Sequence, residues 1–298
     1  MQQELIIAIL AGIGGMLGWG FADFFAKKTV DKIGSITSLV WAHIFGTLAL
    51  SLVLFYKTFL LQQPTDIPGD FNAWILLFLF GGLQAVVYLL LYQAFSKGKL
   101  AVINPIFASY SGVAAFLSIV VFGEIVNPYL LLALGVIFGG LILLNLDTSA
   151  FRAKHFKLTG TPGLKEALAA LILAAIWTVS WDKFVSGKDW LSYALLMYSF
   201  MTVVAFSISK VQKTDLSIKH NGLWKFLILI GICEVIAYLA ISLGFSMTSF
   251  TSIVALLSGA FSLPTIILAR MFLKEKVTSI QTIGSIVIIA GIILLSLR

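Results

Sequence analysis

One carboxylate stands deep inside an apolar segment of this chain. Glu234 lies near the middle of residues 223–245, and Tyr238 and Ser242 follow it at intervals of four residues. This spacing places the three side chains on one face of a helix. An ionised carboxylate at the centre of a bilayer costs about 3 kcal/mol on insertion scales, so it needs a partner, a proton or water. We expect Glu234 to face a water-accessible cavity, or else to be protonated and bonded to a neighbouring helix.

The same pattern occurs a second time. Residues 82–95, GLQAVVYLLLYQAF, align without a gap on residues 232–245, ICEVIAYLAISLGF. The matching polar stripe consists of Gln84, Tyr88 and Tyr92. We expect both stripes to line a substrate site, with simple contacts between helices as the alternative for the Tyr and Gln side chains.

His43 is the second titratable group at this depth, near the middle of residues 35–55. Because imidazole changes its charge close to neutral pH, His43 could share a proton with Glu234 or bind an anion. The alternative is a buried histidine that is hydrogen-bonded between helices.

Three tryptophans also lie well inside apolar segments, where they could stack on an aromatic ligand or face an ammonium group. They are Trp19, Trp41 and Trp177. Interfacial anchoring is the other common role of such residues.

Charged residues near the ends of two apolar segments predict ion pairs that anchor helix ends. Asp23 and Lys27 are four residues apart, and Asp182 is followed by Lys183. An acidic residue so close to Trp19 could alternatively form the rim of a cavity.

The composition is that of a membrane protein. Of 298 residues, 60% are hydrophobic and only 11% are charged, with a mean hydropathy of +1.04, outside the usual range of soluble domains. The single cysteine, Cys233, excludes an internal disulfide. Neither a metal-ligand motif, nor a phosphate-binding glycine loop, nor a catalytic serine motif is present. We therefore expect no enzyme, no cofactor, no metal site and no nucleic-acid partner.

Apolar stretches long enough to cross a bilayer occur ten times and predict an all-α integral membrane protein. They cover residues 5–25, 35–55, 73–95, 101–121, 129–146, 164–183, 190–209, 223–245, 250–272 and 279–297. We expect two five-helix repeats, residues 1–147 and 164–298, joined by a connection at 148–163. Because five is an odd number, the two copies enter the bilayer from opposite sides, as an inverted repeat.

The distribution of basic residues predicts the orientation in the membrane. Of the 20 Lys and Arg residues, all but Lys57, Lys183, Lys188 and Arg298 fall on one side of the predicted spans. That side is expected to be cytoplasmic. The chain then resides in the cytoplasmic (inner) membrane with both termini outside.

Small residues and prolines mark places where helices pack or bend. Gly14 and Gly18, and Gly135 and Gly139, have the spacing of helix-packing faces. These faces belong either inside the protomer or between two protomers of a homodimer. Asn104-Pro105 and Pro264 interrupt two predicted spans, where we expect ordinary kinks.

The chain resembles the drug/metabolite transporter superfamily, of the ten-helix EamA type. The similarity rests on Trp19-Gly20, Trp177, FGE at 122–124, LKE at 273–275 and GSIVIIAG at 284–291, with a looser ALGVIFGG at 133–140. The resemblance implies a transporter of small metabolites with a cavity between its two repeats. Small four-helix relatives carry an essential glutamate in their first helix, whereas this chain has no acidic residue in that span before Asp23.

These observations together predict a secondary transporter or facilitator that works by alternating access. An acidic centre among aromatic residues favours a cationic or zwitterionic solute, such as an amine or an amino acid. Glu234 is expected to act as counter-ion or as proton carrier. A membrane scaffold subunit and a passive channel are the alternatives.

Overall fold

The computed structural model describes residues 2–98, 103, 106–145, 162–273 and 278–296, and all regular structure within them is helical. The first half contains α1 (Gln2–Ile33), α2 (Ser35–Phe55), η1 (Tyr56–Leu60), α3 (Phe71–Lys97), α5 (Tyr110–Phe116), η2 (Leu117–Val121) and α6 (Pro128–Asn145). The second half contains α8 (Leu164–Val185), α9 (Trp190–Val211), η4 (Asn221–Leu223), α10 (Trp224–Met247), α11 (Thr251–Gly259), α12 (Ser262–Leu268), η5 (Ala269–Leu273) and α13 (Ser279–Ser296).

Seven helices of the described residues are long and apolar enough to cross a membrane. Three further apolar helices are shorter, at Ile106–Val121, Pro128–Leu144 and Ser279–Leu295. Each of the ten predicted stretches therefore contains helical structure, the ninth as more than one helix, while ten complete crossings and the inverted relation of the halves stay predictions. Most of the predicted connection at 148–163 lies outside the described residues, as do Asn104, Pro105 and Glu275.

Local sequence signals determine where several helices begin. Asp70 precedes α3 and accepts a hydrogen bond of 2.7 Å from the backbone N–H of Ala73, as a helix N-cap does. A single residue, Gly34, separates α1 from α2, and its φ of 80° lies in the left-handed region. Glycine adopts this conformation without steric strain, so α2 can start directly after α1 and turn back along the bundle.

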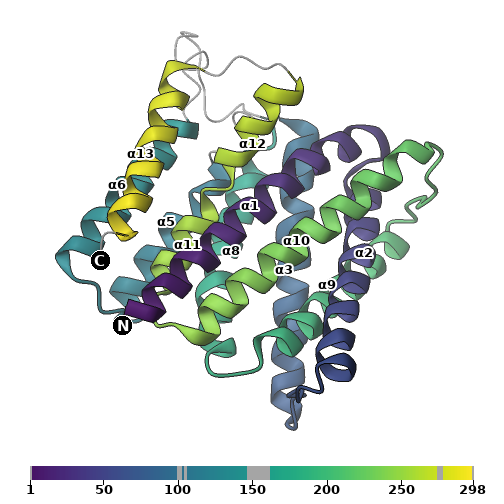
Figure 1. Ribbon diagram of the computed structural model, residues 1–298. Coiled ribbons are helices and arrows are strands. Elements are labelled where there is room, and N and C mark those ends of the chain that lie inside the picture. The colour runs from purple at the N-terminus through teal and green to yellow at the C-terminus, as the bar shows by residue number, and fades with distance from the viewer. Residues whose placement is uncertain (1, 99–102, 104–105, 146–161, 274–277, 297–298) are drawn as a thin grey trace.

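The first helix packs closely along α10, side by side with it in Figure 1. A Cβ atom at Gly18 would lie 2.6 Å from the carbonyl oxygen of Cys233, and one at Gly14 would lie 2.6 Å from Cβ of Ala240. These glycines thus form a packing face inside the protomer. The space beside Gly135 is open instead.

Helices α6 and α13 form a pair at one side of the molecule (Figure 1). Gly140 of α6 and Gly284 of α13 face each other, since a Cβ atom at either would approach the backbone of the other helix within about 3 Å. Tyr129 extends the contact with a hydrogen bond of 2.6 Å to the carbonyl oxygen of Leu294.

The predicted ninth span is broken, not merely kinked. Helix α11 ends at Gly259 and α12 begins at Ser262, so two residues stand between them. Pro264 lies in the first turn of α12, where its missing N–H is tolerated. The expectation of an ordinary kink is therefore corrected, because α11 ends before Pro264 is reached. Phe261, one of the two residues between the helices, is buried in the bundle.

Charged side chains join segments at both ends of the bundle. Lys97 and Glu166 form an ion pair of 2.6 Å that links the end of α3 to the start of α8. At the opposite end, Glu124 accepts hydrogen bonds from the backbone N–H and the hydroxyl group of Ser252, the second residue of α11. The glutamate of the FGE motif thus caps a helix that lies far away in the sequence.

Candidate functional site

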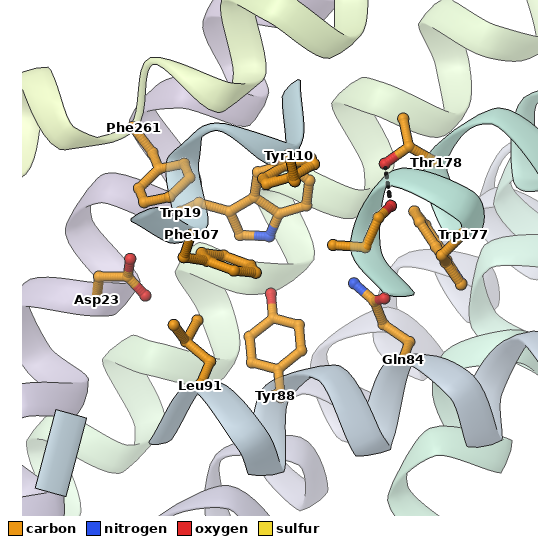
Figure 2. A pocket seen from close by; sticks show the side chains of 11 residues that line it. Trp19, Asp23, Gln84, Tyr88, Leu91, Phe107, Tyr110, Trp177, Thr178 and Phe261 are labelled. Carbon is orange, nitrogen blue, oxygen red and sulfur yellow. Dashed lines mark hydrogen bonds between the residues drawn. The ribbon is translucent and has the colours of Figure 1, made fainter. Parts of the chain in front are cut away.

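A small cavity lies between α1, α3, α8, the helix Ile106–Val121 and the break between α11 and α12 (Figure 2). Six of its eleven lining residues are aromatic: Trp19, Tyr88, Phe107, Tyr110, Trp177 and Phe261. The others are Asp23, Gln84, Leu91, Ala174 and Thr178. Both predicted repeats therefore contribute to this cavity.

The cavity is too small for a metabolite in this conformation. Its volume is about 30 Å³, and a water molecule needs at least about 10–15 Å³ of such volume. One or two water molecules fit, whereas a metabolite requires the surrounding helices to move apart.

Three polar groups in the cavity have no partner among the described residues. The indole Nε1 of Trp19 and the amide Oε1 of Gln84 are buried without a hydrogen bond. Asp23, only 6% exposed, makes neither a hydrogen bond nor an ion pair with any described side chain. In contrast, the hydroxyl group of Thr178 donates to the carbonyl oxygen of Ala174 at 2.8 Å. An unpaired buried polar group costs about 1–3 kcal/mol, so these atoms are suited to a bound ligand.

A second polar cluster surrounds Glu234, whose exposed fraction is 0%. Tyr198 donates a hydrogen bond of 2.6 Å to Oε2, and Tyr92 donates one of 3.4 Å to Oε1. Nε2 of His43 lies 3.7 Å from the same Oε2. We call these four residues the Glu234 cluster; they come from α2, α3, α9 and α10.

Two glycines allow the Glu234 cluster to form. A Cβ atom at Gly231 would overlap the backbone of α2 at Ala42, so glycine lets α10 approach α2 closely. A Cβ atom at Gly46 would overlap the hydroxyl group of Tyr198. Because both positions lack a side chain, Tyr198 fits between α2 and α10 and reaches Glu234.

The orientation of His43 is set by its own helix. Nδ1 lies 2.8 Å from the carbonyl oxygen of Leu39, and since a carbonyl group only accepts, Nδ1 carries a hydrogen. Nε2 has no hydrogen-bond partner among the described residues and faces Glu234. The ring stacks on Tyr198 with centroids 5.1 Å apart. The pair is therefore arranged to hold a proton on either Nε2 or the carboxyl group.

The cavity and the Glu234 cluster are directly connected. Gln84, which lines the cavity, donates a hydrogen bond of 2.8 Å from Nε2 to the hydroxyl group of Tyr238. The ring of Tyr238 in turn lies edge-on to Trp19 at 5.9 Å and to Tyr198 at 5.4 Å. Tyr88 lines the cavity and has its ring 5.5 Å from that of His43. Tyrosine side chains thus bridge the two places.

The predicted site residues divide between these two places. Trp19, Gln84, Tyr88 and Trp177 line the cavity, Glu234, His43 and Tyr92 form the cluster with Tyr198, and Tyr238 lies between them. The expected orientation of Glu234 toward a water-accessible cavity is wrong for this conformation, because tyrosine hydroxyl groups and His43 enclose its carboxyl group. Ser242 instead accepts a hydrogen bond of 3.2 Å from the indole nitrogen of Trp181, a contact between helices.

Of the two roles expected for Asp23, the ion pair with Lys27 is wrong, and a position at a cavity is the one observed. Lys27 pairs with Asp31 at 2.7 Å, one turn further along α1, which leaves Asp23 facing the cavity. Asp23 follows Trp19 by four residues, the same spacing that places Glu234 and Tyr238 on one face of their helix. That spacing was the available signal for Asp23.

Other residues lacked such a signal or had a different role. Tyr198, Tyr110, Phe107 and Phe261 belong to apolar stretches in which nothing marks them out. Trp41 lies away from both places: its indole donates to the carbonyl oxygen of Leu216 at 2.8 Å, and its ring packs on Trp224. Among the described residues, no three His, Cys, Asp or Glu side chains gather as metal ligands would.

Both the sequence and the fold of this chain are similar to those of known proteins. The model of the EamA-like transporter family matches the sequence twice, at residues 6–146 and 161–297. A solved protein structure is similar over 96% of this chain and 95% of that chain, with a TM-score of 0.73 and 16% sequence identity, which shows a common fold alone. No curated protein is similar enough to count as a match. Because the two family matches cover nearly the whole sequence, this chain belongs to the EamA-like transporter family.

Proposed function

We propose a function that builds on membership of this family, which makes the chain an integral membrane protein and a transporter of the drug/metabolite type. We propose that it carries a small cationic or zwitterionic solute, such as an amine or an amino acid, by alternating access. The solute binds in the cavity between the two repeats, and the Glu234 cluster binds a proton that is exchanged during the cycle.

The hydrogen bond between Gln84 and Tyr238 is the observation that carries this proposal. It joins a cavity with unpaired polar atoms to Tyr238, whose ring packs on Tyr198 beside the buried carboxylate and imidazole that can hold a proton. Movement of Gln84 toward a bound solute withdraws the donor from Tyr238, next to Tyr198 and Glu234. Such a shared contact is what coupling between solute and proton requires.

The two alternatives fit these observations less well. A passive channel needs a continuous polar path, whereas the cavity described here is small and enclosed by aromatic rings. A scaffold subunit has no need for unpaired polar atoms around a central cavity, since each of them lowers stability.

Proton flux in liposomes tests the proposed function. Purified protein is reconstituted with a pH-sensitive dye inside the vesicles, and amines or amino acids identified in a thermal-shift screen are added outside. We expect a solute-dependent pH change with the wild type. Glu234→Gln should abolish that change while it retains exchange of labelled solute for unlabelled solute. Proton flux at the wild-type rate in Glu234→Gln would remove Glu234 from the mechanism, and indifference to every compound would favour a scaffold.

We also propose the orientation that the basic residues predict, in the inner membrane with both termini outside. Helix α1 begins and α13 ends at the same side of the molecule (Figure 1), as this orientation requires. A reporter enzyme that is active only in the cytoplasm, fused after Arg298, should be inactive; activity there would reverse the orientation.

A further inference from the structure

We propose that Asp23 is the counter-ion for the cationic group of the solute, so that this transporter selects amines carrying a single positive charge over amino acids. The inference rests on the proposed function, because it assumes that the solute binds in the cavity. It assigns the substrate-binding charge to α1, whereas Glu234 on α10 keeps the proton.

No basic side chain of the described residues neutralises Asp23. Lys27, one turn away, is paired with Asp31 at 2.7 Å. Lys28 lies over the rings of Phe24 and Phe226, at 4.6 and 5.1 Å from their centroids. A buried ionised carboxylate without a partner is strongly unfavourable, and a cation that enters the cavity supplies the missing partner.

The other cavity groups complete a site for an ammonium ion. Oε1 of Gln84 is a second acceptor without a partner among the described residues. The amide nitrogen of the same side chain donates to Tyr238, which fixes the orientation of the amide group. Six aromatic rings surround the space, and their faces attract cations by about 0.5–2 kcal/mol each when suitably placed. Figure 2 shows the hydroxyl group of Tyr88, whose oxygen can accept from an ammonium group, turned toward the middle between Asp23 and Gln84.

The same residues discriminate against a carboxylate on the solute. None of the eleven residues that line the cavity is Lys, Arg or His. Among the described residues, the buried donor of the cavity that lacks a partner is the indole N–H of Trp19. A bound amino acid would therefore bury its carboxylate without a positive partner, whereas an amine leaves no charge unpaired. This difference predicts selectivity for the amine.

Two matched pairs of compounds test the inference. Full-length protein in detergent is titrated with 2-phenylethylamine and phenylalanine, and with isobutylamine and valine, by isothermal calorimetry. Within each pair the side chain is the same and only the carboxylate differs. We expect at least tenfold tighter binding of each amine. Asp23→Asn, which is nearly isosteric, should weaken amine binding at least tenfold, and Asp23→Glu should restore part of it.

Asp31→Asn is the control variant, because Asp31 lies on the same helix but is exposed and paired with Lys27. It should bind the amines as the wild type does. The inference is overturned if no amine binds, if the amino acids bind as tightly as the amines, or if Asp23→Asn keeps the wild-type affinity. Exchange of the bound compounds in liposomes tests the role of Asp23 separately from the proposed transport function. Equal transport of amino acids by wild type and Asp23→Asn would refute the role of Asp23 and retain the transporter, whereas no exchange of any solute would refute both.

Discussion

The hydroxyl group of Tyr198 donates a hydrogen bond of 2.6 Å to Oε2 of Glu234, and both side chains are fully buried. Tyr198→Phe removes this donor, so that Oε2 loses a hydrogen bond and keeps its contact with Nε2 of His43. The loss of a buried hydrogen bond costs about 1–3 kcal/mol, so the variant should unfold at a lower temperature than the wild type. Tyr193→Phe on the same helix is the control, because no hydrogen bond from the Tyr193 hydroxyl group is seen among the described residues. Equal unfolding temperatures for both variants would contradict the importance of the bond.

His43 should be needed for proton movement and not for the fold. His43→Phe keeps a ring that can pack on Tyr198 and Tyr88 but cannot carry a proton. We expect solute-driven proton flux in liposomes to fall at least tenfold while exchange of labelled solute continues. His220→Gln, a change in the segment before η4, should leave both rates unchanged. Undiminished proton flux in His43→Phe would limit His43 to a packing role.

The contact between α1 and α10 should tolerate no added atom at Gly18. A Cβ atom there would lie 2.6 Å from the carbonyl oxygen of Cys233 and 2.8 Å from the backbone nitrogen of Ala237, and neither can move without its helix. Gly18→Ala should therefore destabilise the protein by about 1–3 kcal/mol. Gly82→Ala is the matched control, since its nearest neighbour, Val204, is 3.9 Å away. Thermal unfolding of both variants decides the point, and equal behaviour would mean that α1 and α10 are loosely packed.

The ion pair between Lys57 and Asp189 should give a pH-dependent contribution to stability. Nζ of Lys57 lies 2.8 Å from both carboxyl oxygens, and Ser192 donates at 2.6 Å. Burial raises the pKa of Asp189, but the hydrogen bonds from Lys57 and Ser192 outweigh it and hold the pKa below its ordinary value. The stabilisation is therefore complete above the unfolded-state pKa of about 3.9 and is lost as the pH falls through the lower folded-state pKa.

Asp189→Asn tests that contribution. The variant should be less stable than the wild type at pH 7, and the difference in unfolding temperature should shrink as the pH is lowered through and below 4. Asp31→Asn, which removes an exposed pair worth about 0.3–0.5 kcal/mol, should show a much smaller effect at every pH. A difference that is constant between pH 7 and pH 3 would rule out the ionic contribution.

Glu124 should stabilise the first turn of α11. It caps the helix at the backbone N–H of Ser252 at 2.9 Å, and loss of a helix cap costs about 1–2 kcal/mol. Glu124→Ala should therefore speed hydrogen exchange at the first amides of α11, measured by mass spectrometry. Glu124→Gln keeps a side-chain acceptor and should have the smaller effect. Unchanged exchange in both variants would show that water replaces the cap without penalty.

The helices could be predicted from the sequence because the bilayer demands long apolar segments. Asp70 at the start of α3 and Gly34 between α1 and α2 are local signals of the same kind. The break between α11 and α12 was not predictable, because Pro264 marks only the neighbourhood of a helix end. Where the chain actually turns depends on the close approach of Pro264 to Gly20 on α1, which is a tertiary contact.

The candidate site was predictable only in part. The two polar stripes indicated that α3 and α10 meet, and Gln84 does donate to Tyr238. Spacing along one helix, however, does not say which neighbour a face will contact. For this reason Glu234 was expected in the cavity, and Tyr198, which encloses it, was not anticipated. Asp23 was assigned to Lys27 because sequence distance alone does not show that Lys27 turns to Asp31.

The single-residue link at Gly34 has a mechanical consequence. It joins the helix that bears Asp23 end to end with the helix that bears His43, with no slack between them. A displacement of the last turn of α1 has to be matched at the start of α2, because one residue alone lies between them. We therefore expect that glycines inserted after Gly34 loosen the mechanical connection between the helix of Asp23 and the helix of His43.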